Sequence, residues 1–132
     1  MVINGLINAP FVEHGGNNMH ADFMKDVGLC EFLGAEQILH DMTGTSKKDV
    51  IEELVELLIK KKLIKNKSET LKRILEREEL MSTGLGDSVA IPHARLEVGE
   101  KPIIAMGRHS LGLDFDSPDK KPVHLIMLVL WA

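Results

Sequence analysis

The sequence predicts an α/β fold, in which a mixed central sheet is sandwiched by helices. Two tandem segments, one over 46–62 and one from Ser68 onward, carry apolar residues at the spacing of amphipathic helices. Two later segments, 102–107 and 123–130, are apolar with too little polar alternation for strands that face water. Strands that are apolar on both faces need cover on both faces, and helices supply that cover in this fold class.

The chain has 132 residues, 44% of them hydrophobic, which is enough for one compact domain and too little for two. We place this domain at residues 35–132. Residues 1–34 mix Gly, Asn and isolated apolar residues without a sustained period, and Gly15–Asn18 is a cluster of residues that break regular structure. We expect residues 1–34 to be an N-terminal tail or a segment that covers the domain.

The elements of the domain follow in order from local signals. Residues 37–42 are predicted to form a short strand that ends at the turn-forming residues 43–45. Ser46 with Asp49 is a variant of the capping box, which starts the first helix. The apolar face of this helix is formed by Val50, Leu54, Leu57 and Leu58. The second helix is predicted to start at Ser68 and to end toward Gly84, because glycine often terminates helices.

Composition excludes several classes of function. A net charge of −4 gives no electrostatic footprint for nucleic acid, although the five lysines within 60–67 form one local basic patch. We interpret that patch as a solvated helix end, with a partner-binding role as the alternative. The longest apolar stretch, 125–132, is far shorter than the roughly 20 residues that span a bilayer. We therefore expect a cytoplasmic protein without direct membrane insertion.

Neither disulfide nor metal chemistry is indicated. A lone Cys30 cannot form an internal disulfide, which suits a reducing compartment. The histidines at positions 14, 20, 40, 109 and 124 show no pair at ligand spacing on a common element. We expect no metal site.

The candidate site is the segment STGLGDSVAIPHAR at Ser82–Arg95. Gly84 and Gly86 let the backbone turn sharply and could present amide N–H groups to a phosphate. Residues 89–91 are predicted to be a short buried strand. Pro92 cannot continue a ladder because it lacks an N–H group, so the chain leaves the sheet and His93 lies at its edge.

His93 is then either an ordinary loop residue or a nucleophile. A neutral imidazole can attack phosphorus without a dedicated base. Arg77, on the preceding helix, and Arg95 are the candidates for neutralising a transferred phosphoryl group. Each hydrogen bond to such a charged group is worth about 1.5 to 3 kcal/mol. The spacing of these residues alone leaves both interpretations open.

The segment resembles the signature of the mannitol/fructose-type IIA domains of the bacterial phosphoenolpyruvate-dependent sugar phosphotransferase system, a family that includes the nitrogen-regulatory IIA proteins. In that signature a small-residue turn, an apolar triplet and a Pro-His pair end on the phosphorylated histidine, which is His93 here. The resemblance runs from about Ala35 to Ala132. It includes AEQILHDMTGTSKKDVIEELVELL, RILEREELMSTGLGDSVAIPH and KPVHLIMLVLWA. Arg77 matches a family arginine beside the phosphorylation site.

The resemblance implies a phosphocarrier. His93 would take a phosphoryl group from an HPr-type carrier protein and pass it to a IIB partner or use it for regulation. No cofactor would be needed. An apolar patch around the histidine would dock the partner, with Leu85 and Val89 as candidate wall residues; the alternative is that both belong to the core. The competing function is a IIA-like regulatory or interaction module without turnover.

The sequence departs from the family in one respect. The family continues past the last strand into further helices, one of which carries a second histidine, whereas this sequence ends at Ala132. His124 is not that second histidine, because it stands at the start of the strand. We therefore expect a truncated IIA-type domain that forms a homo-oligomer or recruits residues 1–34 over its sheet. A non-functional fragment of a longer reading frame is the remaining alternative.

Overall fold

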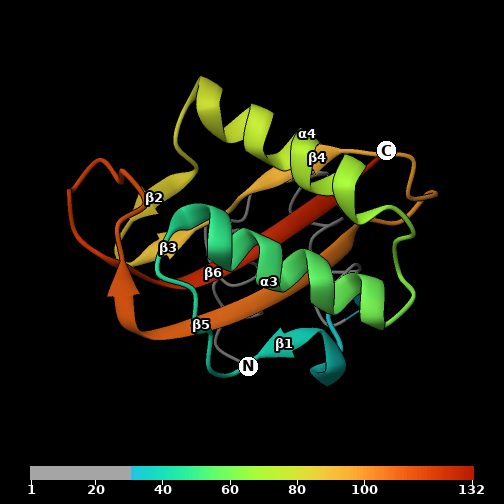
Figure 1. Ribbon diagram of the computed structural model, residues 1–132, viewed down its shortest axis with the longest axis horizontal. Helices are drawn as coiled ribbons and strands as arrows, with labels where there is room; N and C mark the ends of the chain where they lie inside the picture. Colours follow the sequence, from blue (N-terminus) through green and yellow to red (C-terminus); the bar gives the residue numbers. More distant parts are fainter. Residues whose placement is uncertain (1–30) are drawn as a thin grey trace, which may run out of the picture. The chain divides into compact units, whose positions relative to one another are not determined.

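The computed structural model describes residues 31–132, and residues 35–132 form one compact unit. The predicted N-terminal segment lies outside the described residues up to position 30. Figure 1 shows the elements in chain order. They are the 3₁₀ helix η2 (Ala35–Gln37), β1 (Ile38–Leu39), α3 (Lys47–Lys60), α4 (Lys67–Leu80), β2 (Gly84–Gly86), β3 (Val89–Ala90), β4 (His93–Arg95), β5 (Ile103–Leu113) and β6 (Val123–Trp131).

The six strands form one mixed sheet, as predicted. The strand order is β1-β5-β6-β3-β2, and β4 also pairs with β6. The long β5 and β6 run antiparallel, while β1 is parallel to β5 and both β3 and β4 are parallel to β6. Strand β6 is thus hydrogen-bonded to three other strands and organises the sheet.

The two helices described lie on the same face of this sheet (Figure 1). The core fills the space between them and the sheet. Its fully buried side chains include Val50, Ile51, Leu54, Val55 and Leu58 of α3, Ile74 of α4, and Ile126, Leu128 and Leu130 of β6. Residues 1–34 are the segment predicted to cover the other face of the sheet. Most of these residues fall outside the described range.

Helix α3 begins as predicted. The Ser46 hydroxyl oxygen accepts a hydrogen bond from the Asp49 backbone N–H at 3.1 Å, which satisfies one of the N–H groups left free at a helix start. The buried face is wider than predicted, because Ile51 and Val55 join the core while Leu57 is only half-buried.

Helix α4 differs from the prediction at both ends. It starts at Lys67 rather than Ser68, because the Asn66 side chain caps it by accepting from the Glu69 N–H at 3.0 Å. It ends at Leu80, and Met81 is already extended. Gly84 does not terminate the helix; it is the first residue of β2.

The prediction that the chain leaves the sheet at Pro92 is wrong. Ala90 pairs with Ile126, and His93 pairs with Val129. The spacing from Ala90 to His93 equals the spacing from Ile126 to Val129, so the pairing register is the same on both sides of Pro92. The ladder is only interrupted at Pro92, and the Val129 N–H still donates to the Pro92 carbonyl at 3.0 Å. Proline removes a donor but keeps its acceptor, which is enough to hold the register.

Strand β5 is longer than the predicted segment 102–107. Its second half alternates, with Arg108 and Ser110 exposed and His109 buried, and its pairing with β6 shifts register between Arg108 and Leu113. A strand with one solvent-exposed face carries polar residues at alternate positions.

Replacing Leu54 by alanine tests the position of the core. Leu54 is fully buried, so we expect Leu54→Ala to lower the free energy of unfolding by about 2 to 5 kcal/mol. The matched control is Leu80→Ala on α4, because Leu80 is 82% exposed, and this change should stay within about 0.5 kcal/mol of wild type. Urea unfolding followed by circular dichroism measures both. Equal losses would contradict the core assignment.

Candidate functional site

His93 is the first residue of β4 and is half-buried. Its Nδ1 lies 2.8 Å from the Ile91 carbonyl oxygen. A carbonyl oxygen can only accept a hydrogen bond, so Nδ1 is the nitrogen that carries the proton. In the neutral ring, Nε2 therefore holds the free lone pair.

The strand alternation fixes which way His93 points. Ala90, Pro92 and Ala94 are buried, whereas His93 and Arg95 occupy the intervening positions. Successive side chains of a strand point to opposite faces, so His93 and Arg95 point away from Ala94 and the core. Among the described strands β4 pairs only with β6, so both residues lie at the edge of the sheet that α4 borders.

An open pocket of about 520 Å³ lies beside His93. One wall is a single stripe of helix α4 at helical spacing, and the other comes from strands β4 and β6. The lining residues are Arg73, Glu76, Arg77, Leu80, His93, Ala94, Arg95 and Trp131. Three arginines against one glutamate make this pocket positive in a chain whose net charge is −4. The pocket therefore suits an anion.

Arg77 is half-buried at the end of α4. Its Nη1 donates to the Met81 carbonyl at 3.0 Å, which satisfies a carbonyl group that the helix end leaves without an intrahelical partner. This bond uses one N–H of the guanidinium and fixes the side chain along the pocket wall. The structure thus brings Arg77 and His93 to one pocket, although the sequence separates them.

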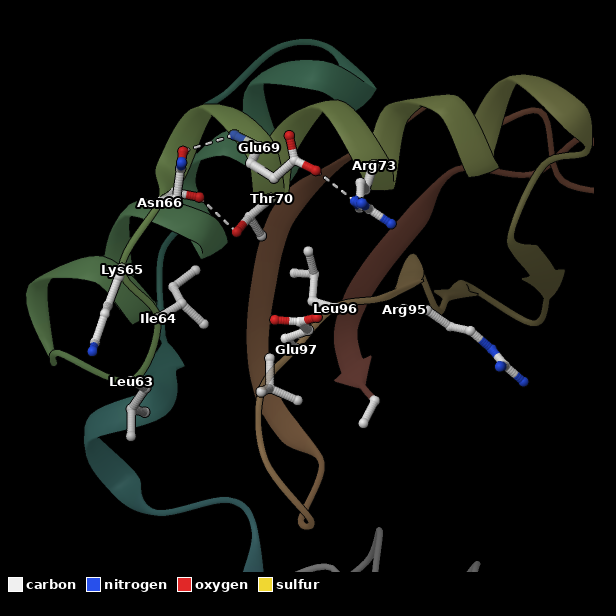
Figure 2. Close-up of a pocket in the computed structure, with 12 residues that line it drawn as sticks. Leu63, Ile64, Lys65, Asn66, Glu69, Thr70, Arg73, Arg95, Leu96 and Glu97 are labelled. Carbon is white, nitrogen blue, oxygen red and sulfur yellow. Dashed lines mark hydrogen bonds and ion pairs between the residues drawn. The ribbon is translucent and has the colours of Figure 1, made fainter.

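The other two arginines are exposed. The Arg73 Nε donates to Glu69 Oε1 at 2.6 Å, and this hydrogen bond lowers the pKa of the Glu69 carboxyl below its ordinary value. Arg95 has no such neighbour in Figure 2, where its side chain extends away from Glu69 and Thr70. Arg95 lies on the same face of β4 as His93. Because Arg95 is exposed while Arg73 is bonded to Glu69, Arg95 is the more adaptable of these two cations.

A second, larger hollow of about 790 Å³ adjoins this pocket and shares Arg73 and Arg95 with it (Figure 2). It lies between the start of α4 and the segment after β4. No histidine lines it, and Glu69 and Glu97 offset its cations. The smaller pocket contains His93 and the larger excess of cations over carboxylates, so we take it as the candidate site.

Gly84 and Gly86 lie outside the pocket of His93. They belong to β2, which pairs with β3. Strand β3 pairs near the start of β6, where Val89 lies opposite Leu125, whereas His93 lies opposite Val129, four residues further along β6. The Gly84 N–H already donates to Ser82 Oγ at 3.1 Å. A Cβ at Gly84 would approach Ser117 Oγ to 2.3 Å, and Gly86 has a φ of 93°. Both glycines are needed for the shape of the hairpin.

The two residues predicted to dock a partner are also on this hairpin. Leu85 is 61% exposed, whereas Val89 is half-buried and pairs with Leu125. Neither lines the pocket of His93. Other apolar residues stand nearer to it, since Leu80 is 82% exposed on the pocket wall and Met81 follows it at 71%.

A buried carboxylate connects α4 to the loop that leads into the site. Glu78 Oε2 accepts from the Thr83 N–H at 2.9 Å and from Lys47 Nζ at 2.9 Å, and the Thr83 hydroxyl donates to Oε1. The side chain of Glu78 is only 5% exposed. Although partial burial disfavours the charge, the bonds from Glu78 and Asp116 raise the pKa of Lys47 above its ordinary value.

Sequence reasoning missed five lining residues, which are Arg73, Glu76, Leu80, Ala94 and Trp131. Arg73 and Leu80 lie one turn on either side of Arg77, so the helix period could have found them. Trp131 gave no such signal, because only strand pairing brings it to His93.

The chain belongs to the family described as "Phosphoenolpyruvate-dependent sugar phosphotransferase system, EIIA 2", whose sequence model matches residues 31–131. It is 35% identical over 101 residues to the PTS system fructose-specific EIIABC component of Bacillus subtilis, which is 76% of this chain and 16% of that protein. The chain thus spans a small part of that relative's length.

Solved structures share the fold. The nitrogen regulatory protein IIA-Ntr of Neisseria meningitidis matches with a TM-score of 0.70 and 38% identity, over 76% of this chain and 68% of that one. A complex of IIA-mannitol with phosphorylated IIB-mannitol from Escherichia coli matches with a TM-score of 0.64 and 25% identity. The match covers 75% of this chain and 69% of that one. The mixed sheet with its two helices is therefore the fold of this family.

The described residues lack both a membrane-spanning helix and a cluster of metal-ligating side chains. Within 31–132, no helix is long and apolar enough to cross a membrane. The same residues contain no group of three or more His, Cys, Asp or Glu side chains that could hold a metal ion.

Changing Glu78 tests the anchor of the site loop. Glu78→Gln removes the charge that pairs with Lys47, so we expect the free energy of unfolding to fall by about 3 kcal/mol. Glu79→Gln is the matched control, because Glu79 is exposed on the same helix and should change stability by less than about 0.5 kcal/mol. Chemical unfolding measures both. If the two variants lose the same amount, the buried carboxylate does not anchor this loop.

Proposed function

We propose that this chain is a phosphocarrier that accepts a phosphoryl group on Nε2 of His93. One observation carries the proposal: the Ile91 carbonyl holds the proton on Nδ1, which leaves the lone pair of Nε2 free beside a pocket lined by three arginines. Membership in the EIIA 2 family supports phosphotransfer, because the family is described as part of a sugar phosphotransferase system and its model matches residues 31–131, which include His93.

The transfer needs no base. The Nε2 lone pair forms a bond to phosphorus while the bond from phosphorus to the donor's histidine nitrogen breaks, and that electron pair returns to the donor ring. The Nδ1 proton stays on its bond to the Ile91 carbonyl. The charge on the three equatorial oxygens requires positioned cations, and Arg77 and Arg95 supply them from opposite walls of the pocket.

The partners follow from the relatives. The donor would be an HPr-type phosphocarrier protein in the cytoplasm, and the acceptor a IIB component, as in the mannitol complex from E. coli. The exposed Leu80, Met81 and Leu85 would form the apolar docking surface, with Val89 supporting it from the half-buried side of the hairpin. Gly84 and Gly86 would serve by shaping the hairpin that presents Leu85 and not by holding the phosphoryl group.

A second function is favoured by the likeness to nitrogen regulatory protein IIA-Ntr. In that case the chain would act as a regulatory or interaction module, and turnover to a IIB partner would be dispensable. The two functions differ in whether His93 becomes phosphorylated and whether the phosphoryl group then leaves to IIB.

Labelling of His93 is the direct test. Incubation with a phosphorylated HPr-type protein should add one acid-labile phosphoryl group to the wild-type chain, seen by intact mass, and none to His93→Ala. The control is His40→Ala, because His40 is an exposed histidine outside the pocket. An unlabelled wild type would refute phosphotransfer and leave the regulatory module, whereas label on His93→Ala would refute the residue.

Arg77 should matter to the rate and not to the fold. Loss of a charged hydrogen bond to the phosphoryl group, worth about 1.5 to 3 kcal/mol, predicts about 10- to 150-fold slower transfer in Arg77→Met. Arg108→Met is the matched control, because Arg108 is an exposed arginine of β5 outside the pocket. Quench-flow measurement of transfer gives both rates. If Arg77→Met reacts as fast as Arg108→Met, Arg77 does not hold the phosphoryl group.

A further inference from the structure

The ring of His93 has a second fixed neighbour besides the Ile91 carbonyl. The centroids of the His93 and Trp131 rings are 5.4 Å apart, and the ring planes make an angle of 25°. This geometry is an offset stack, the arrangement that aromatic pairs favour. The imidazole is therefore held at one nitrogen by a hydrogen bond and over its face by the indole.

Strand register makes this contact. His93 pairs with Val129 and Arg95 pairs with Trp131, in parallel strands. Val129 and Trp131 are two residues apart and so project from the same face of β6, which is the face that His93 shares. Leu128 and Leu130 are fully buried on the opposite face. The contact is thus part of the sheet and does not depend on a loop.

Phosphoryl transfer changes the charge of the ring that Trp131 covers. When Nε2 bonds to phosphorus and Nδ1 keeps its proton, both nitrogens carry a substituent and the imidazole becomes formally cationic. A cation within about 6 Å of an indole centroid is attracted by the negative face of the ring system. The stack is consequently stronger after transfer than before it.

From these contacts we infer that Trp131 is a positioning residue for phosphorylation of His93. This inference rests on the proposed function. Trp131 restricts rotation of the imidazole, keeps Nε2 at the pocket, and stabilises the positive ring charge that develops as the bond to phosphorus forms. Only stabilisation that grows toward the transition state speeds the step, and the growth of ring charge meets that condition. Half-burial leaves the indole accessible at the pocket wall.

The test compares Trp131→Phe with two non-aromatic variants, Trp131→Leu and Trp131→Gln. Single-turnover transfer is measured with a phosphorylated HPr-type protein and with phosphoramidate, a small phosphoryl donor that needs no docking surface. We expect the non-aromatic variants to react about 3- to 10-fold more slowly with both donors at saturation, while the half-saturating concentration of the protein donor is unchanged. Trp131→Phe should recover most of the rate.

Two further measurements separate positioning from a structural role. Met127→Ala is the matched control, because Met127 is half-buried on the same face of β6 and outside the pocket, and it should leave the rate within about 2-fold of wild type. Trp131 is the single tryptophan of the chain, so its emission should change on phosphorylation of wild type and not change in His93→Gln. Circular dichroism selects the non-aromatic variant that folds.

The outcomes are distinct. Unchanged rates in the non-aromatic variants, with wild type labelled, overturn the inference and leave the proposed function standing. A loss confined to the protein donor also overturns it, because Trp131 would then serve docking. A wild-type chain that takes no phosphoryl group from either donor overturns the proposed function and this inference together.

Discussion

The register of β4 against β6 is the constraint on which the site depends. Because Pro92 interrupts the ladder without shifting it, His93 stays opposite Val129 and within reach of Trp131. A shift by one residue would turn His93 toward the core, since side chains alternate between the faces of a strand. The buried Ala90, Pro92 and Ala94 on one face and the fully buried Leu128 and Leu130 of β6 resist such a shift. The core thus sets the direction in which His93 points.

Helix α4 supplies the opposite wall, and it is attached both by Ile74 in the core and by a buried ion pair. Glu78 is buried, and it is tolerable there because Lys47 and Thr83 satisfy its oxygens. These bonds connect the start of α3, the end of α4 and the loop before β2. Arg77, next to Glu78 in sequence, is thereby placed on the wall that faces the β4 edge. One helix turn therefore carries both the buried anion Glu78 and the pocket cation Arg77.

The site separates fixed groups from adaptable ones. His93 is held by a hydrogen bond and a ring contact, and Arg77 by its bond to the Met81 carbonyl. Arg95 is exposed and so can follow an incoming group. In the proposed function His93 accepts a phosphoryl group and releases it again. A ring that is held in place beside one bonded and one exposed arginine suits that task.

The sequence by itself determined what local chemistry controls. The Ser46 cap, the apolar faces of α3 and β6, and the Pro-His motif are all set by neighbours a few residues apart, and the mixed α/β sheet follows from their order. Only the tertiary structure decided which residues share the pocket. Residues of α4, β4 and β6 meet there because strand pairing and helix packing bring distant segments together. Trp131 beside His93, and the glycine hairpin away from it, are consequences of sheet register, which no local pattern encodes.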